Sequence, residues 1–164
     1  MRSLSFSALC FYFSLLLAVP TVLPAAPHRE LGQVAWLRNY EEALRQSRET
    51  GKPICLLFQE VPGYQGCVQY GRETLSHPLI VQALEEAFVP VAIFNNQPGY
   101  DRKILEQFGE PAWNYQVMRF LNEQGKDLIP RKDQVWTPRA TAERMIQALK
   151  AASRPVPEAL EWFR

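Results

Sequence analysis

The sequence lacks several features that mark common functional classes. Its 164 residues include only three cysteines and two histidines, and its charges nearly cancel to a net +1. Lysine and arginine are scattered among the acidic residues, so nothing indicates nucleic acid or another charged polymer as a partner. There is no internal repeat and no low-complexity tract. The 47% hydrophobic content fits one globular domain with a substantial core.

Clustered metal-ligating residues are also absent. Cys67 and His77 lie ten positions apart, without the short spacing typical of zinc sites. His77 precedes a proline at a predicted helix start, which favours a surface or capping role. We therefore expect no metal site and no cofactor.

The first 26 residues form a separate segment. Arg2 precedes an apolar stretch from Leu4 to Val19, and the small residues Ala25 and Ala26 come before a polar switch at His28. This pattern predicts a signal peptide over residues 1–26, followed by a domain over residues 27–164 in the periplasm or outside the cell. An uncleaved anchor is the alternative, and only in that case would a membrane be a partner. Two prolines in the segment argue against a spanning helix.

The predicted mature chain keeps two cysteines, Cys55 and Cys67. An even number in an exported protein suggests a disulfide. However, Cys55 begins an apolar run, Ile54 to Phe58, that is typical of a strand buried on both faces, and Cys67 follows the far end of that run. The strand alone would separate them by about 10 Å, more than the roughly 7 Å between Cα atoms that a disulfide allows. We expect a buried Cys55 and an unpaired Cys67.

Periodicity and capping signals predict alternating helices and strands. A capping box at Asn39 starts a helix that ends near Gly51, and Ser76 is expected to cap a later one. The expected strands are residues 54–58, 89–94, 116–121 and 127–130, with a hairpin loop over 122–125. Further helices are expected over 66–73, after 76, over 101–108 and before Pro155, followed by a tail in which Leu160, Trp162 and Phe163 pack on the domain. This order predicts an α/β fold whose mixed sheet has parallel strands and a C-terminal antiparallel hairpin, flanked by helices.

Several segments resemble the thioredoxin-like superfamily over roughly residues 36–152. They are Glu41 to Leu44, Thr50-Gly51-Lys52-Pro53, Leu56 to Phe58, Cys67 with Gly71 to Pro78, and Phe88 to Val91. The match is to a secreted branch in which a G-K-P-I segment leads into the strand before a C-x-x-C motif. The resemblance implies a thioredoxin-like fold and a function related to thiol-disulfide exchange.

The motif itself is incomplete. Counting back from Arg72-Glu73-Thr74, Cys67 takes the second cysteine position and Tyr64 takes the first, so the stretch reads Tyr64-Gln65-Gly66-Cys67. In the family the first cysteine is the exposed nucleophile, and the second resolves the mixed disulfide. The cis-proline that faces the motif also has no clear counterpart, because Pro111 comes several residues early and Tyr115 stands near its place. A dithiol cycle within this chain is therefore excluded.

Two main interpretations of Cys67 remain open: a buried structural thiol, and a single reactive thiol in the first turn of a helix. A metal ligand is the third alternative, against which the spacing to His77 argues. Tyr64, Gln65, Gly66, Trp113 and Tyr115 fall where the motif loop and its facing loop meet, at the carboxyl ends of parallel strands, where open α/β sheets bind ligands. Each aromatic residue taken singly favours packing, but the group suits a groove for a peptide or protein segment. Glu60, at the same rim, is positioned to tune a nearby thiol or is simply solvated.

Two functions follow from these alternatives. In the first, Cys67 is the catalytic residue of an oxidoreductase-like protein that forms mixed disulfides with a partner bearing an exposed cysteine. In the second, the protein is a redox-inactive module that binds a protein or peptide near Tyr64 and Tyr115. Exposure of the Cys67 sulfur discriminates between them.

Overall fold

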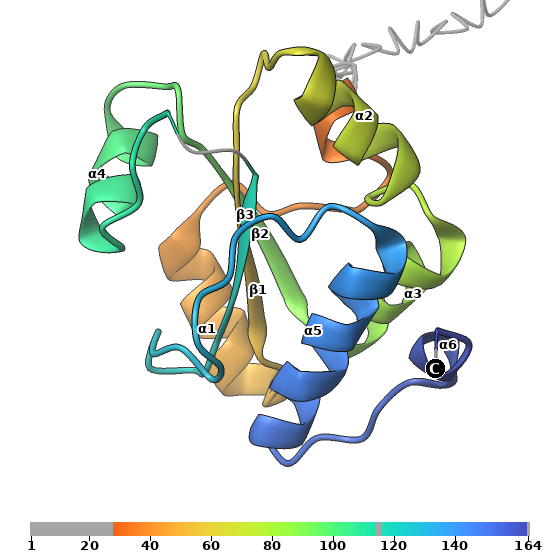
Figure 1. Ribbon diagram of the computed structural model, residues 1–164. Helices are drawn as coiled ribbons and strands as arrows, with labels where there is room; N and C mark the ends of the chain where they lie inside the picture. Colours follow the sequence, from red (N-terminus) through yellow and green to blue (C-terminus); the bar gives the residue numbers. More distant parts are fainter. Residues whose placement is uncertain (1–27, 114–115, 164) are drawn as a thin grey trace, which may run out of the picture.

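The computed structural model describes residues 28–113 and 116–163 of the chain. Figure 1 shows helices on both sides of a small central sheet. The elements are the 3₁₀ helix η1 (Arg29–Leu31), α1 (Tyr40–Thr50), β1 (Ile54–Gln59), α2 (Gln65–Glu73), α3 (Pro78–Ala87), β2 (Val89–Phe94), α4 (Tyr100–Gln107), β3 (Val117–Leu121), α5 (Pro138–Ala151) and α6 (Glu158–Glu161).

The sheet has the strand order β2-β1-β3. β1 runs parallel to β2, with pairs from Ile54↔Val89 to Gln59↔Phe94, and antiparallel to β3. The predicted parallel neighbours and the predicted mixed sheet are both confirmed. A single parallel bridge between Leu37 and Val91 extends the sheet beyond β2, and this pairing was not predicted.

The apolar run of β1 is explained by two separate hydrophobic cores. Cys55 and Leu57 point into one core, which packs against α3, α5 and α6, whereas Ile54, Leu56 and Phe58 point into the other, against α1 and α4. Side chains alternate between the faces of a strand, so a strand covered on both faces is apolar along its length, and its one polar residue, Gln59, lies at its end and is hydrogen-bonded. The predicted burial of Cys55 is confirmed, and the structure leaves it unpaired.

The ends of α1 match their sequence signals. The Asn39 side chain accepts a hydrogen bond from the Glu42 amide at 2.7 Å, as a capping box requires. Gly51 ends the helix in the left-handed conformation at φ 68°, and its amide donates to the Ser47 carbonyl. Local chemistry therefore determines both ends of this helix.

The prediction that Ser76 caps the next helix is wrong. His77 is the N-cap of α3, and Pro78 is the first helical residue. Proline at this position has its φ already in the helical range and lacks the amide that would otherwise be unsatisfied. The Ser76 hydroxyl instead donates to the Gly71 carbonyl at 2.8 Å.

The predicted strand over residues 127–130 is reduced to one antiparallel bridge, Leu121↔Asp127. The Leu128 amide still donates to the Phe120 carbonyl at 2.8 Å. Two residues later, where the next such bond would form, stands Pro130, which has no amide hydrogen to donate. The chain therefore leaves the sheet and continues as a loop to α5.

The C-terminal tail packs as predicted at two of its three positions. Leu160 is fully buried and Phe163 packs against the core, but Trp162 is 74% exposed. Leu160 and Phe163 are three residues apart and share one helical face, whereas Trp162 lies on another face. The prediction that Trp162 packs on the domain is therefore wrong.

A charged network holds the loops on either side of β3. The buried Glu110 carboxylate contacts Arg119 at 3.1 Å and Arg131 at 2.8 Å, and Arg119 also contacts Asp127. The network thus ties the segment before β3 to the loop that leads into α5. A buried carboxylate requires such partners, because an unpaired charge in the interior is strongly unfavourable.

The predicted signal segment, residues 1–26, lies outside the described residues, so the structure does not bear on it. Within residues 28–113 and 116–163, no helix is long and apolar enough to cross a membrane.

Candidate functional site

The half motif forms the start of α2, at the carboxyl end of β1. Tyr64 is the N-cap residue, with an extended backbone, and its carbonyl accepts hydrogen bonds from the amides of Cys67 at 3.0 Å and Val68 at 3.2 Å. Cys67 therefore lies in the first turn of α2, as predicted. Gln65 is exposed at the first helical position, and the helix begins there rather than at Gly66.

The Cys67 side chain is nonetheless completely buried. The backbone at Gly63 passes directly over it: a Cβ atom added to Gly63 would lie 2.6 Å from the Cys67 Cβ and 3.0 Å from the Sγ. On another side the Gln116 Oε1 lies 4.0 Å from the Sγ. Only a glycine at position 63 permits so close a cover, so the motif loop itself closes over the sulfur.

Burial raises the pKa of the Cys67 thiol to about 11, and the nearby Glu60 carboxylate adds to this shift. Hydrogen bonds with Glu60 and Tyr64 oppose the shift without cancelling it. The rise is opposite in direction to the lowered pKa of reactive thiols at helix N-termini. At pH 7 about one thiol in ten thousand would be ionised at the pKa of about 11.

Tyr64 takes the exposed place in the motif. Its side chain is 44% exposed and its ring lies against Gly66, where an added Cβ would come within 2.6 Å of the tyrosine Cε2. Because Gly66 has no side chain, the edge of the Tyr64 ring can approach the first turn of α2 closely. The surface that would carry a nucleophile in a complete motif carries an aromatic ring instead.

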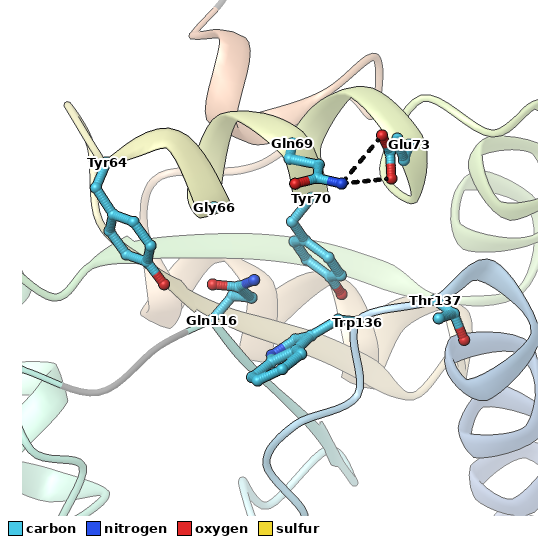
Figure 2. A pocket seen from close by; sticks show the side chains of 8 residues that line it. All are labelled: Tyr64, Gly66, Gln69, Tyr70, Glu73, Gln116, Trp136 and Thr137. Atoms are coloured by element: carbon cyan, nitrogen blue, oxygen red, sulfur yellow. Dashed lines mark hydrogen bonds between the residues drawn. The ribbon is translucent and has the colours of Figure 1, made fainter.

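A groove of about 430 Å³ opens beside this ring, between α2 and the loop that leads into α5. Figure 2 shows Tyr64 at one end, Trp136 on the wall opposite α2 and Gln116 between them. The lining residues are Tyr64, Gly66, Gln69, Tyr70, Glu73, Gln116, Trp136 and Thr137.

Two of the predicted site residues, Tyr64 and Gly66, line this groove. Gln65 does not, and neither does Trp113, which is 78% exposed in the loop before β3. Tyr115 lies outside the described residues. The sequence analysis missed Trp136, although Thr137-Pro138 is a helix-start signal that could have placed it at the beginning of α5.

Two hydrogen bonds fix the backbone at Trp136 and at the residue that follows it. The buried Thr74, which follows α2, donates its hydroxyl proton to the Trp136 carbonyl at 2.7 Å. Thr137 is the N-cap of α5, and its side chain accepts from the Ala140 amide at 3.2 Å. The opposite wall of the groove is therefore fixed relative to α2.

Glu30, in η1, and Gln59, at the end of β1, form hydrogen bonds that hold the motif loop. The Glu30 carboxylate accepts a hydrogen bond from the Gly63 amide at 2.9 Å. The buried Gln59 side chain donates to the Glu30 carbonyl at 2.8 Å and to the Cys67 carbonyl at 3.3 Å. Residues that precede α1 thus help to hold the loop closed over Cys67, which no local sequence signal indicated.

The structure gives no support to metal binding. Among residues 28–113 and 116–163, no group of three or more His, Cys, Asp or Glu side chains could hold an ion. His77 lies at the start of α3 and its ring packs near that of Phe163, with centroids 5.2 Å apart.

The fold agrees with the comparison to known families. The family model described as thioredoxin-like matches residues 35–129. The chain belongs to the thioredoxin-like family. The resemblance found in the sequence is thereby confirmed.

Individual relatives point in the same direction. The chain is 30% identical over 77 residues to the thioredoxin-related protein DsbJ of Chlamydia pneumoniae, a match that covers 47% of this chain and only 22% of that protein. Among solved structures, a DsbH oxidoreductase matches 81% of this chain and 95% of its own, with a TM-score of 0.56 and 22% identity. A thioredoxin from Thermus thermophilus matches 70% of this chain and 85% of its own, with a TM-score of 0.55 and 18% identity. At these identities the two structures show a shared fold.

We expect the buried thiol to make stability fall at alkaline pH. The folded state keeps Cys67 protonated up to a pKa of about 11, whereas the unfolded thiol ionises near its ordinary value of 9.0. The stabilising contribution of the neutral thiol is therefore complete below pH 9 and is lost as the pH rises to 11, by at most about 1.4 kcal/mol per pH unit. Urea unfolding of wild type and Cys67→Ala between pH 7 and pH 10.5 measures this difference.

The stability difference between the two proteins should be constant up to pH 8.5 and should then shift in favour of Cys67→Ala. Cys55 is present in both proteins, so its own titration cancels. If the free energies of unfolding of the two proteins changed in parallel from pH 7 to pH 10.5, folding would not raise the pKa of the Cys67 thiol.

Proposed function

We propose that this protein is an exported thioredoxin-fold module that binds an extended protein or peptide segment in the groove beside Tyr64 and Trp136. It does not carry out a dithiol cycle. One observation carries the proposal: the exposed position of the motif is an aromatic residue, while the only thiol of the motif, Cys67, is fully buried with its pKa raised to about 11.

A dithiol oxidoreductase needs an ionised, accessible thiol and a second thiol close to it. Cys67 meets neither condition. Cys55, the other cysteine of the described residues, is buried in the sheet and pairs with Pro90 of β2 and Phe120 of β3, so it is not a resolving partner.

The groove has features that suit a polypeptide. Tyr64 and Trp136 each leave more than two fifths of their side chain exposed, at 44% and 43%. Partly exposed aromatic rings flanked by amide groups, here those of Gln69 and Gln116, supply apolar contact area and hydrogen bonds to a main chain. The wall that carries Trp136 is fixed before binding, which lowers the entropic cost of association.

A second candidate is single-thiol exchange at Cys67. It is favoured by the position of Cys67 in the first turn of α2 and by the structural similarity to the DsbH oxidoreductase. In this reaction the Cys67 thiolate attacks a partner disulfide, forms a mixed disulfide and releases one partner thiolate. An external thiol must then attack the mixed disulfide to free Cys67. The loop at Gly63 would have to move aside to expose the sulfur.

Binding of a thiol-free unfolded chain tests the proposal directly. S-carboxymethylated insulin B chain, followed by isothermal titration, should bind wild type and Cys67→Ala with affinities that agree within about twofold, because the thiol takes no part. The double variant Tyr64→Ala/Trp136→Ala should bind about tenfold more weakly, since aromatic anchors dominate such interfaces. Trp162→Ala, which removes an exposed tryptophan outside the groove, is the matched control and should leave the affinity unchanged.

Failure of wild type to bind would remove the module proposal. If Cys67 nevertheless formed a mixed disulfide with a disulfide-bearing protein, the second candidate would replace it.

Catalysis gives a separate prediction. Wild type should show no multiple turnover in insulin disulfide reduction with dithiothreitol, because the one thiol of the motif is buried and almost entirely protonated and so does not attack the insulin disulfide. Tyr64→Cys restores C-x-x-C from the N-cap into the first turn of α2 and should produce turnover above the uncatalysed rate. Tyr64→Ser is the control and should remain inactive. Tyr64→Cys/Cys67→Ser depends on dithiothreitol to release each mixed disulfide and should turn over more slowly than Tyr64→Cys. Turnover by the wild type would show that the Cys67 thiol reacts and would favour the second candidate.

Export is the part of the proposal that rests on residues 1–26, which lie outside the described residues. The positive, apolar and small-residue regions in that order support it, as does the likeness to proteins named DsbJ and DsbH. Protein purified from its natural host should begin near Ala26 or Pro27, measured by intact mass and N-terminal sequencing. A mature protein that begins at Met1 would instead support the anchored alternative.

A further inference from the structure

The groove beside Tyr64 combines one negative charge with several aromatic rings. Glu73 is the only formally charged residue among its described lining residues, which include no lysine or arginine. We propose that this groove selects an arginine side chain of the bound segment, with the guanidinium between the Trp136 ring and the Glu73 carboxylate. This inference rests on the proposed binding of a protein or peptide and names the side chain that it recognises.

The charge at this end of the groove favours a cation. Glu73 is the last residue of α2, and the carboxyl end of a helix carries the negative end of its dipole. The Glu73 carboxylate already accepts from Gln69 at 3.2 and 3.1 Å (Figure 2), and from Arg72 at 2.8 Å. The Arg72 side chain, next to Glu73 in the chain, is 67% exposed and that of Glu73 is 50% exposed, so this ion pair is weak and another guanidinium can compete for the carboxylate.

The aromatic wall favours arginine over lysine. A planar guanidinium stacks on an indole face and still presents its fork of N–H groups to a carboxylate, whereas an ammonium group does only one of these well. The chain binds one of its own arginines in this way: Arg38 lies 3.3 Å from the centroid of the Phe94 ring and contacts both Asp101 oxygens, at 3.0 and 2.9 Å. An aromatic ring with a carboxylate is therefore a combination that already holds a guanidinium in this fold.

One feature of the groove acts against this preference. The N-terminus of α5 also reaches it, at Thr137, and helix N-termini attract anions. Two of its donors are unavailable, however, because Pro138 has no amide hydrogen and the Ala140 amide donates to the Thr137 side chain. We therefore expect the preference for a cation, set by Glu73 and Trp136, to outweigh the attraction of the α5 N-terminus for an anion. A peptide carrying a glutamate tests whether the groove instead prefers an anion.

Five peptides of the form acetyl-Ala-Leu-Xaa-Leu-Ala-amide test the selection, with arginine, citrulline, lysine, glutamine or glutamate at the central position. Citrulline keeps the shape of arginine and removes its charge. Titrations followed by the backbone amide resonances of Gln69 and Tyr70 should show the arginine peptide binding about tenfold more tightly than the citrulline peptide. The lysine peptide should fall between them, and the preference should shrink as salt is raised.

Matched variants locate the effect. Glu73→Gln should reduce the preference for arginine over citrulline to about twofold or less. Glu86→Gln is its control, because Glu86 on α3 accepts from Gln82 at 2.9 Å in the same helical spacing but lies outside the groove. Trp136→Ala should weaken binding of the arginine peptide about fivefold or more, whereas Trp162→Ala should not.

The possible failures are distinguishable. Equal binding of the arginine and citrulline peptides overturns the arginine selection and leaves the proposed binding function standing. Tighter binding of the glutamate peptide also overturns it and would identify the α5 N-terminus as the dominant charge. If none of these peptides binds and the carboxymethylated insulin chain does not bind either, the proposed function fails and the selection fails with it.

Discussion

The burial of β1 on every side is the constraint on which the rest of the structure depends. All six residues of this strand are buried, its two edges pair with β2 and β3, and its two faces enter separate cores. Such a strand cannot shift register without moving side chains to the wrong face or breaking bonds on both edges. Its carboxyl end therefore fixes where the motif loop leaves the sheet and where α2 begins.

That anchoring explains why Cys67, at the second cysteine position of the motif, is buried and has a raised pKa. Gln59, the last residue of β1, is fully buried and bonds to the Cys67 carbonyl, while Glu30 holds the Gly63 amide. These contacts hold the motif loop at Gly63 over the Cys67 sulfur. Burial of the thiol therefore outweighs the influence of the helix N-terminus and raises the pKa of Cys67. In this chain the thiol is buried, whereas the aromatic groove is open to solvent.

Most of the fold was predictable because its signals are local or periodic. The capping box at Asn39, the left-handed glycine at position 51 and the apolar run of β1 each act within a few residues. The errors arose where two signals competed or where a distant contact decided the outcome. His77, not Ser76, is the N-cap because Pro78 starts the helix. Pro130 ended a strand that the hairpin-loop signal at residues 122–125 had indicated. Trp162 has a hydrophobic side chain on the side of a short helix that faces away from the core.

Some features of the candidate site follow from the sequence alone, and others depend on the tertiary structure. The sequence by itself determined that Tyr64 replaces the first cysteine of the motif, that Cys67 lies in the first turn of α2, and that an internal dithiol cycle is impossible, because these depend on residue identity and spacing. Only the tertiary structure decided that the Cys67 sulfur is buried and that Trp136, not Trp113, lines the groove. Burial and pKa depend on atoms brought together from Glu30, Gln59 and Gln116, which lie on three different segments of the chain. The position of Trp136 likewise depends on its hydrogen bond with Thr74, 62 residues away, and no pattern within a short window of sequence encodes such a contact.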